Sequence, residues 1–145
     1  MFNQIIMLAT GASIPMLGAG TWQIPNEDAH RVVLEALETG YRLIDTAAAY
    51  RNEEGVGRAV RESGIARGDI FLTSKLAAET KGYRETLDAF DQTMEALGLE
   101  YLDLYLIHAP WPWSDMGGDY TACLLYTSYT AVEWREAPSA RLRAR

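Results

Sequence analysis

The sequence predicts a parallel α/β fold in which short apolar strands alternate with amphipathic helices. Three apolar runs, at 41–44, 70–74 and 102–107, are separated from one another by helical patterns. Such alternation implies parallel strands joined by right-handed crossovers. An ionisable residue stands at or just after the end of each run, and catalytic groups of parallel folds gather at the carboxyl ends of strands. The pattern therefore predicts both the fold class and the end of the sheet that carries a site.

The chain opens with a predicted β-hairpin. Two short strands, at 4–8 and 14–17, flank the turn-forming residues 10–13. Such a hairpin could close one end of a barrel. A further short strand leads to Gly20 and precedes the first helix.

Three helices follow from the spacing of apolar residues. The first is predicted to begin with Asn26 as its cap and to end at Gly40, the second covers about 52–63, and the third ends at Gly98. The apolar faces comprise Val32, Val33, Ala36 and Leu37, then Val56, Ala59 and Val60, then Leu87, Phe90, Met94 and Leu97. The acidic residues predicted to lie on solvated faces, without a functional role, are Glu53, Glu54, Asp88, Asp91 and Glu95.

Composition narrows the function classes. A chain of 145 residues with 48% hydrophobic content suits one domain with a core. Its net charge of −7 offers no basic field for nucleic acid or anionic lipid. The start lacks a basic leader, and no apolar stretch reaches the roughly 18–20 residues of a membrane helix. We therefore expect a cytoplasmic protein without nucleic-acid or membrane partners, and the sequence leaves its oligomeric state open.

The cysteine and histidine content argues against a metal centre. Cys123 is the single cysteine, which excludes an internal disulfide framework and a multi-cysteine zinc site. The two histidines, His30 and His108, fall on a predicted exposed helix face and at a strand end, with no ligand spacing between them. We expect no metal.

Two parallel architectures fit the alternation, a doubly wound sheet and a (β/α)8 barrel, and periodicity does not choose between them. A dinucleotide-binding doubly wound sheet would need Gly-x-Gly-x-x-Gly after a strand. The segment that begins Gly18-Ala19-Gly20 lacks the third glycine, and Gly55 and Gly57 fall inside a predicted helix. The sequence therefore gives little support to such a site.

Four blocks of sequence carry a family resemblance. Residues 40–57, GYRLIDTAAAYRNEEGVG, closely resemble the first signature of the aldo-keto reductases. Residues 94–108, MEALGLEYLDLYLIH, look like the second. The likeness runs from about Leu8 to Tyr120 and includes GTW, which begins at Gly20, and the TSK that ends at Lys75. Agreement in four blocks, in order and at family spacing, is improbable by chance.

The resemblance implies a (β/α)8 TIM barrel that binds NADPH or NADH without a Rossmann fold. It implies an oxidoreductase that reduces small aldehydes or ketones to alcohols. It also implies that the cofactor is bound by Gly20, Thr21, Trp22 and Asp45. The tract HAPWPW, which begins at His108, is similar to a bacterial branch that includes diketogluconate reductases.

The chemistry of carbonyl reduction explains four of the ionisable residues. Hydride delivery to a carbonyl carbon builds negative charge on the oxygen, so the site must supply a proton and polarise that oxygen. Tyr50 can donate the proton if a nearby cation, Lys75, stabilises the phenolate. Asp45 would pair with Lys75 and fix its position, and His108 would hydrogen-bond the substrate oxygen. These catalytic roles match the tetrad of the family.

Each assignment has a plainer alternative. Asp45 and Tyr50 taken alone would be a loop cap and a half-buried aromatic. Lys75 after a strand is ordinarily a solvated charge, and His108 is ordinarily a strand terminus. Trp22 and Trp111, which we predict to bind substrate with His108, could instead simply cover the mouth of the barrel.

The last 25 residues depart from the family. Residues 1–120 hold 9 Lys and Arg against 18 Asp and Glu, whereas residues 121–145 hold 4 against 2. The string CLLYTS, from Cys123, looks like a translated sequencing-library adapter. A whole barrel needs about 250 residues. We predict the amino-terminal half of a barrel at 1–120, truncated after about four strands, and a non-native tail at 121–145 from a sequencing or gene-model artefact.

Two classes of function remain open from sequence. One is the oxidoreductase, represented by its amino-terminal half and possessing the Asp45, Tyr50, Lys75 and His108 set. The other is a non-catalytic binding or regulatory protein on the same scaffold, since a fold does not establish an activity. A binding protein has no chemical need to retain all four groups, so the set favours the enzyme. A third reading is an inactive fragment, because an open half-barrel exposes strand edges. The family's serine-asparagine pair for the carboxamide and its basic cluster for the 2′-phosphate have no counterpart in this chain.

Overall fold

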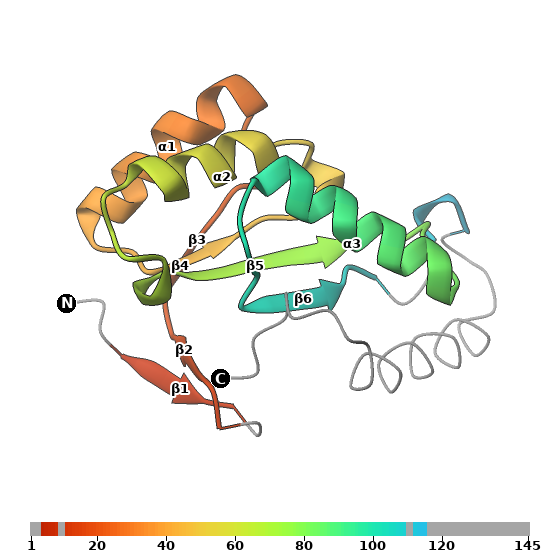
Figure 1. Cartoon of the computed structure of the whole chain (residues 1–145), viewed down its shortest axis with the longest axis horizontal. Helices are drawn as coiled ribbons and strands as arrows, with labels where there is room; N and C mark the ends of the chain where they lie inside the picture. Colours follow the sequence, from red (N-terminus) through yellow and green to blue (C-terminus); the bar gives the residue numbers. More distant parts are fainter. Residues whose placement is uncertain (1–3, 9–10, 110–111, 116–145) are drawn as a thin grey trace.

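The protein forms a four-stranded parallel sheet covered by helices. The structure is a computed structural model, and it describes residues 4–8, 11–109 and 112–115. The strands of the sheet, in spatial order, are β3 (Gly18–Gly20), β4 (Leu43–Asp45), β5 (Phe71–Leu76) and β6 (Leu104–Ile107) (Figure 1). Every neighbouring pair is parallel. Sequential strands are spatial neighbours without a reversal of order, as in successive strands of a barrel and unlike a doubly wound sheet. The predicted parallel arrangement is confirmed.

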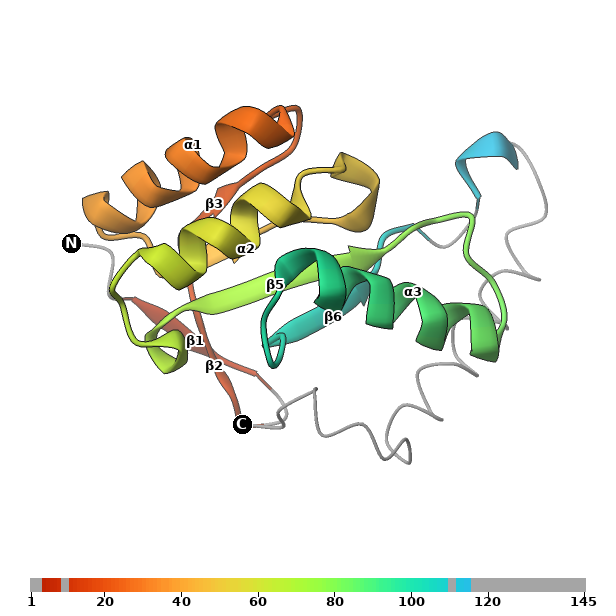
Figure 2. The same ribbon diagram turned by 45° about the horizontal axis from the view of Figure 1, so that its top comes forward.

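Three helices lie on one face of this sheet. They are α1 (Asn26–Thr39), α2 (Glu53–Glu62) and α3 (Tyr83–Leu97), and two views of the molecule show them side by side above the strands (Figures 1 and 2). The buried core between helices and sheet includes Val33, Leu37, Ile44, Val56, Val60, Leu72, Phe90, Met94 and Leu97. Most of the apolar faces predicted from helical spacing are in this core. Burial of such side chains contributes about 1.5–3 kcal/mol each and is what holds the helices to the sheet.

A β-hairpin precedes the sheet. Its strands β1 (Ile5–Met7) and β2 (Ser13–Pro15) pair antiparallel, as the sequence predicted. The hairpin lies toward the end of the sheet at which β5 begins (Figures 1 and 2). Apolar side chains of the hairpin are exposed: Met7 at the end of β1 is 64% exposed, and Met16, directly after β2, is 57% exposed.

Glycines end two of the helices as predicted. Gly40 and Gly98 adopt the left-handed conformation, with φ of 111° and 60°, and their N–H groups return to carbonyls of the last helical turn. The start of α1 differs from the prediction. Pro25, not Asn26, is the residue that precedes the helix, and Asn26 is its first helical residue. The Asn26 side chain instead accepts a hydrogen bond of 3.0 Å from the N–H of Gly55 in the first turn of α2, so it joins α1 to α2 and does not cap its own helix.

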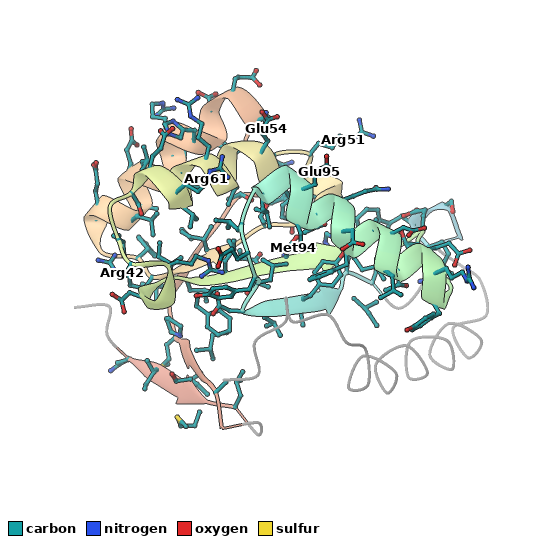
Figure 3. All side chains as sticks on the ribbon, in the orientation of Figure 1. Arg42, Arg51, Glu54, Arg61, Met94 and Glu95 are labelled. Carbon is teal, nitrogen blue, oxygen red and sulfur yellow. The ribbon has the colours of Figure 1, made fainter. Side chains whose placement is uncertain are left out.

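Helices α2 and α3 meet at a close contact. A Cβ atom on Gly57 would lie 1.9 Å from the carbonyl oxygen of Leu97, so only glycine allows the approach. One turn further on, Arg61 donates hydrogen bonds to the carbonyl oxygens of Leu97 and Gly98. Figure 3 shows Arg61 on α2 beside the end of α3. This arginine satisfies carbonyl groups that the helix end leaves without partners.

Short helical turns complete the described chain. They are η1 (Ala48–Tyr50), η2 (Arg67–Asp69) and η3 (Trp113–Asp115). The first and third border the carboxyl ends of the strands and carry candidate site residues. Over residues 4–8, 11–109 and 112–115, no helix has the length and apolar character needed to cross a membrane.

Candidate active site

The centre of the candidate site is an ion pair between two strands. Asp45 ends β4 and is in register with Thr73 of β5, while Lys75 lies two residues further along β5 and so faces the same side. The Lys75 Nζ atom is 2.8 Å from both carboxylate oxygens of Asp45. Only 13% of the Lys75 side chain is exposed, against 38% for Asp45. The carboxylate therefore compensates a cation that would be costly to bury alone.

Tyr50 reaches the same lysine from the following turn. It ends η1, and its hydroxyl oxygen is 3.4 Å from Lys75 Nζ. Lys75 also donates to the carbonyl oxygen of Thr46 at 2.8 Å. An ammonium has three N–H groups. Here the Asp45 carboxylate, the Thr46 carbonyl oxygen and the Tyr50 hydroxyl oxygen accept hydrogen bonds from them. Because the Tyr50 oxygen accepts from Lys75, its own O–H is left to point elsewhere. The predicted convergence of Asp45, Tyr50 and Lys75 is present in the structure.

His108 lies next to Tyr50, just after β6, which is the strand that pairs with β5. It follows β6, and its ring is edge-on to that of Tyr50 with 5.5 Å between centroids. Burial is the main cause that lowers the pKa of His108, the positive charge of Lys75 lowers it further, and Asp45 partly opposes both. The imidazole is therefore neutral at pH 7. Its Nδ1 atom is buried without a hydrogen-bond partner in the described part of the chain, so Nε2 is the better place for the proton.

Two tryptophans border these groups. Trp22, which follows β3 and is 56% exposed, packs edge-on against Tyr50 at 5.5 Å. Trp113, which is 42% exposed, packs edge-on against His108 at 4.8 Å. The N–H groups of Trp113 and Ser114 donate to a carboxylate oxygen of Glu79, at 3.0 and 3.3 Å, which holds η3 in place. Trp22 therefore lies beside Tyr50, and its predicted contacts with cofactor and substrate stay predictions. The other predicted substrate residue, Trp111, lies outside the described residues.

Glu53 is buried, so the solvated helix face predicted for it from the sequence is wrong. Its side chain is 7% exposed, and it accepts hydrogen bonds from Ser74 at 2.6 Å and Thr93 at 3.4 Å. Burial raises the pKa of Glu53, and these hydrogen bonds lower it by less. Burial likewise raises the pKa of Tyr105 to about 12, and the carboxylate of Glu53 adds to the rise. The residues for which a solvated face was correctly predicted are Glu54, Asp88, Asp91 and Glu95.

The residues predicted to bind the cofactor differ in their exposure to solvent. A Cβ on Gly20 would find no atom within 4 Å, so the flank of β3 beside Trp22 is open. An open backbone next to an exposed ring fits a flat nicotinamide. Thr21 is 1% exposed, and its hydroxyl lies 3.3 Å from acceptors within the protein. Its contact with a cofactor stays a prediction. Among residues 4–8, 11–109 and 112–115, no group of three metal-ligating side chains gathers.

Sequence reasoning missed three contributors to this region. Trp113 stands within HAPWPW, but its contact with His108 depends on the path of the chain between them. No sequence pattern around Glu79 indicates that it contributes to this region. Asn52 was predicted only as the start of a helix, yet it is fully buried and donates two hydrogen bonds to the loop between β3 and α1. Its position two residues after Tyr50 is the one signal that could have drawn attention to it.

Comparison with known proteins identifies relatives among the aldo-keto reductases. The family model described as "Aldo/keto reductase family" matches residues 15–132. An aldo-keto reductase of Mycolicibacterium smegmatis is 57% identical over 107 residues, which cover 74% of this chain and 39% of the relative. Glycerol 2-dehydrogenase (NADP(+)) of Saccharomyces cerevisiae is 51% identical, covering 76% and 34%. Glyoxal reductase of Bacillus subtilis is 49% identical, covering 76% and 40%.

Solved structures agree with this fold. An aldo/keto reductase from Brucella melitensis superposes with a TM-score of 0.81 at 47% identity, covering 96% of this chain and 51% of that one. An aldo-keto reductase of Bombyx mori in complex with NADP gives 0.79 at 32% identity, covering 94% and 48%. The described strands, helices and hairpin thus correspond to part of a TIM barrel, and the chain spans about two-fifths of the length of the curated relatives it matches. The chain therefore belongs to the aldo/keto reductase family.

Proposed function

We propose that the complete enzyme reduces small aldehydes or ketones to alcohols with NADPH or NADH, and that Tyr50 donates the proton. The observation that carries this proposal is the position of the Tyr50 hydroxyl, 3.4 Å from the ammonium of Lys75. Relatives named glyoxal reductase and glycerol 2-dehydrogenase (NADP(+)) support the substrate class and the cofactor. The neighbour solved in complex with NADP supports the cofactor too.

In this proposal each residue of the site has its own role. When bound, the cofactor supplies a hydride to the carbonyl carbon, and negative charge develops on the carbonyl oxygen. Tyr50 transfers its hydroxyl proton to that oxygen, and the Lys75 ammonium stabilises the phenolate that remains. Asp45 and the Thr46 carbonyl hold Lys75 in position through contacts of 2.8 Å. His108, neutral at pH 7, donates from Nε2 to the same substrate oxygen.

The proposed contacts with cofactor and substrate are supported by the solvent exposure of the described side chains. We propose that Gly20 and Trp22 face the nicotinamide together with Asp45, and that Trp22, His108 and Trp111 contact substrate. The open flank of Gly20 and the exposed ring of Trp22 support this assignment. Trp113 joins the substrate contacts in this proposal, because it packs on His108 while 42% of it stays exposed.

The decisive experiment is Tyr50→Phe in the complete enzyme. This change removes the proton donor and keeps the ring that packs against Trp22 and His108. We expect kcat for aldehyde reduction to fall by about 10²–10⁴-fold, the usual contribution of a positioned acid, while the Kd for NADPH changes little. Steady-state kinetics and nucleotide fluorescence titration measure the two quantities.

A matched control uses the same chemical change elsewhere. Tyr83 is exposed at the start of α3, so Tyr83→Phe should leave turnover as it is. Undiminished turnover of Tyr50→Phe would refute the proposed proton donor. Equal losses in both variants would point to a general effect of removing a tyrosine hydroxyl.

A further inference from the structure

Asn52 is a fully buried amide whose hydrogen-bonding groups are all engaged. Its Nδ2 atom donates to the carbonyl oxygens of Thr21 and Ile24, both at 2.8 Å. Its Oδ1 atom accepts from the hydroxyl of Thr46 at 3.0 Å and lies 3.3 Å from that of Thr21. Asn52 is 0% exposed, as is Thr46. An amide has two donors and two acceptor positions. The protein uses both donors and one acceptor position at 2.8–3.0 Å, and the single Thr21 hydroxyl proton is shared between Asn52 Oδ1 and the Asp45 carbonyl oxygen, each at 3.3 Å.

These bonds join the two loops that carry the aromatic side chains of the site. Thr21 and Ile24 belong to the connection from β3 to α1, which bears Trp22. Asn52 itself ends the connection from β4 to α2, which bears Tyr50. Through Thr46 it also reaches the residue whose carbonyl oxygen accepts from Lys75. One side chain therefore lies between the segments that position Trp22, Tyr50 and Lys75.

Backbone conformation at both loops points to the same residue. Among the described residues, Gln23 and Arg51 are the non-glycine positions with positive φ, at 62° and 56°. Such conformations are costly and persist where the surroundings fix them. Gln23 lies between the two carbonyl groups that Asn52 binds, and Arg51 directly precedes Asn52. The amide thus fixes the two left-handed turns that follow Trp22 and Tyr50.

We propose that Asn52 is a positioning residue for the proton donor: it sets the place of Tyr50 relative to Lys75 and Trp22. This inference rests on the proposed function of Tyr50. The Tyr50–Lys75 contact is already 3.4 Å long, so a small displacement of η1 removes it. A misplacement of about 1 Å from a change outside the reacting groups can cost about 10²-fold in rate.

A double-mutant cycle in the complete enzyme tests the proposal. Asn52→Ala should lower kcat by about 10²-fold. In a Tyr50→Phe background the same change should lower kcat by less than about twofold, because there is no longer a proton donor to misplace. Equal losses in the two backgrounds, or an unchanged kcat for Asn52→Ala, would overturn the proposal. Undiminished turnover of Tyr50→Phe alone would instead refute the proposed function.

A milder variant covers the case in which Asn52→Ala does not fold. Thr46→Val removes a single hydroxyl that donates to Asn52 Oδ1 and keeps the shape of the side chain. We expect a fall in kcat of about three- to tenfold that disappears with Tyr50→Phe. A fall that persists in that background, or no fall at all, would overturn the proposal.

A stability control separates positioning from general weakening. Val56 is 0% exposed on α2, the helix that Asn52 directly precedes, and its side chain is apolar. Val56→Ala should lower the melting temperature of the enzyme while kcat at 25 °C stays within about twofold of its original value. If Val56→Ala lowers kcat as Asn52→Ala does, the role of Asn52 is structural and the proposal is wrong.

Discussion

At the scale of single residues, the charge state of His108 depends on its neighbours. Burial and the Lys75 ammonium lower the pKa of His108 below its ordinary value of 6.5. Histidine signals in an NMR titration should therefore place its midpoint below 6.5, the value for the unfolded chain. Because the folded state disfavours the proton, this group stabilises the fold above the unfolded pKa, and the stabilisation is lost as pH falls through the folded pKa.

A substitution tests the electrostatic cause. Lys75→Met removes the cation and leaves Asp45 unpaired, and both changes should move the His108 midpoint upward. Arg58→Met removes a positive charge from the exposed side of α2, where Arg58 pairs with Glu62, and should leave the midpoint in place. A midpoint above 6.5 in the unsubstituted protein would contradict the lowering of the His108 pKa by burial and by Lys75.

At the scale of elements, the contact between α2 and α3 depends on a missing side chain. A Cβ on Gly57 would lie 1.9 Å from a backbone oxygen, which cannot move aside as a flexible side chain can. Gly57→Ala should therefore lower the free energy of unfolding by about 3 kcal/mol or more, since it overpacks a helix contact. Urea unfolding monitored by circular dichroism measures the change.

The matched control is Gly20→Ala. Its Cβ would meet no atom within 4 Å, so the free energy of unfolding should shift by no more than about 0.5 kcal/mol. Comparable losses for the two variants would show that the cost comes from replacing any glycine. In that case the close approach of α2 to Leu97 would not be the cause.

The helices could be predicted from the sequence where the spacing of nearby apolar residues determines them. The apolar spacing of Phe90, Met94 and Leu97 fixed α3, and Gly98 ended it as expected. Glu53 could not be predicted, because an acidic residue in the first turn of a helix normally faces water beside the helix dipole. Its burial comes from β5 and α3, which supply Ser74 and Thr93 from 21 and 40 residues further along the chain.

Some features of the candidate site could likewise be predicted from the sequence, and others could not. Asp45, Tyr50, Lys75 and His108 could be placed near one another because parallel strands bring their carboxyl ends together. The hydrogen bonds of Asn52 could not, because they require the register of β3 against β4, in which Gly20 lies opposite Asp45. That register depends on the packing of both strands and not on the residues near position 52.

At the scale of the whole molecule, the described sheet has β3 and β6 at its two edges. The family resemblance implies further cofactor contacts on later strands. We therefore predict that the 145-residue chain, assayed alone, shows neither turnover nor tight nucleotide binding. A spectrophotometric assay of NADPH oxidation with an aldehyde measures this. A purified, monomeric sample that oxidised NADPH in that assay would contradict the prediction.

The boundary near residue 120 also stays a prediction. The family match reaches residue 132, and the described residues end at 115. Resequencing the source locus decides whether 121–145 is native, because an uninterrupted continuation of the gene through Arg145 would refute an artefactual tail. The narrower likeness to the diketogluconate-reductase branch awaits a substrate panel on the complete enzyme.

The left-handed turn at Arg51 has a consequence for anyone who wishes to alter substrate preference. The side chain is exposed and lies next to Tyr50, so position 51 looks like a natural choice for a randomised mutational library. Its backbone, with φ of 56° and ψ of 33°, restricts which members of that library can fold. Glycine, asparagine and aspartate adopt this conformation readily, whereas valine, isoleucine and threonine do not. A library limited to the first group would vary the side chain next to the candidate site without displacing Tyr50, the proposed proton donor.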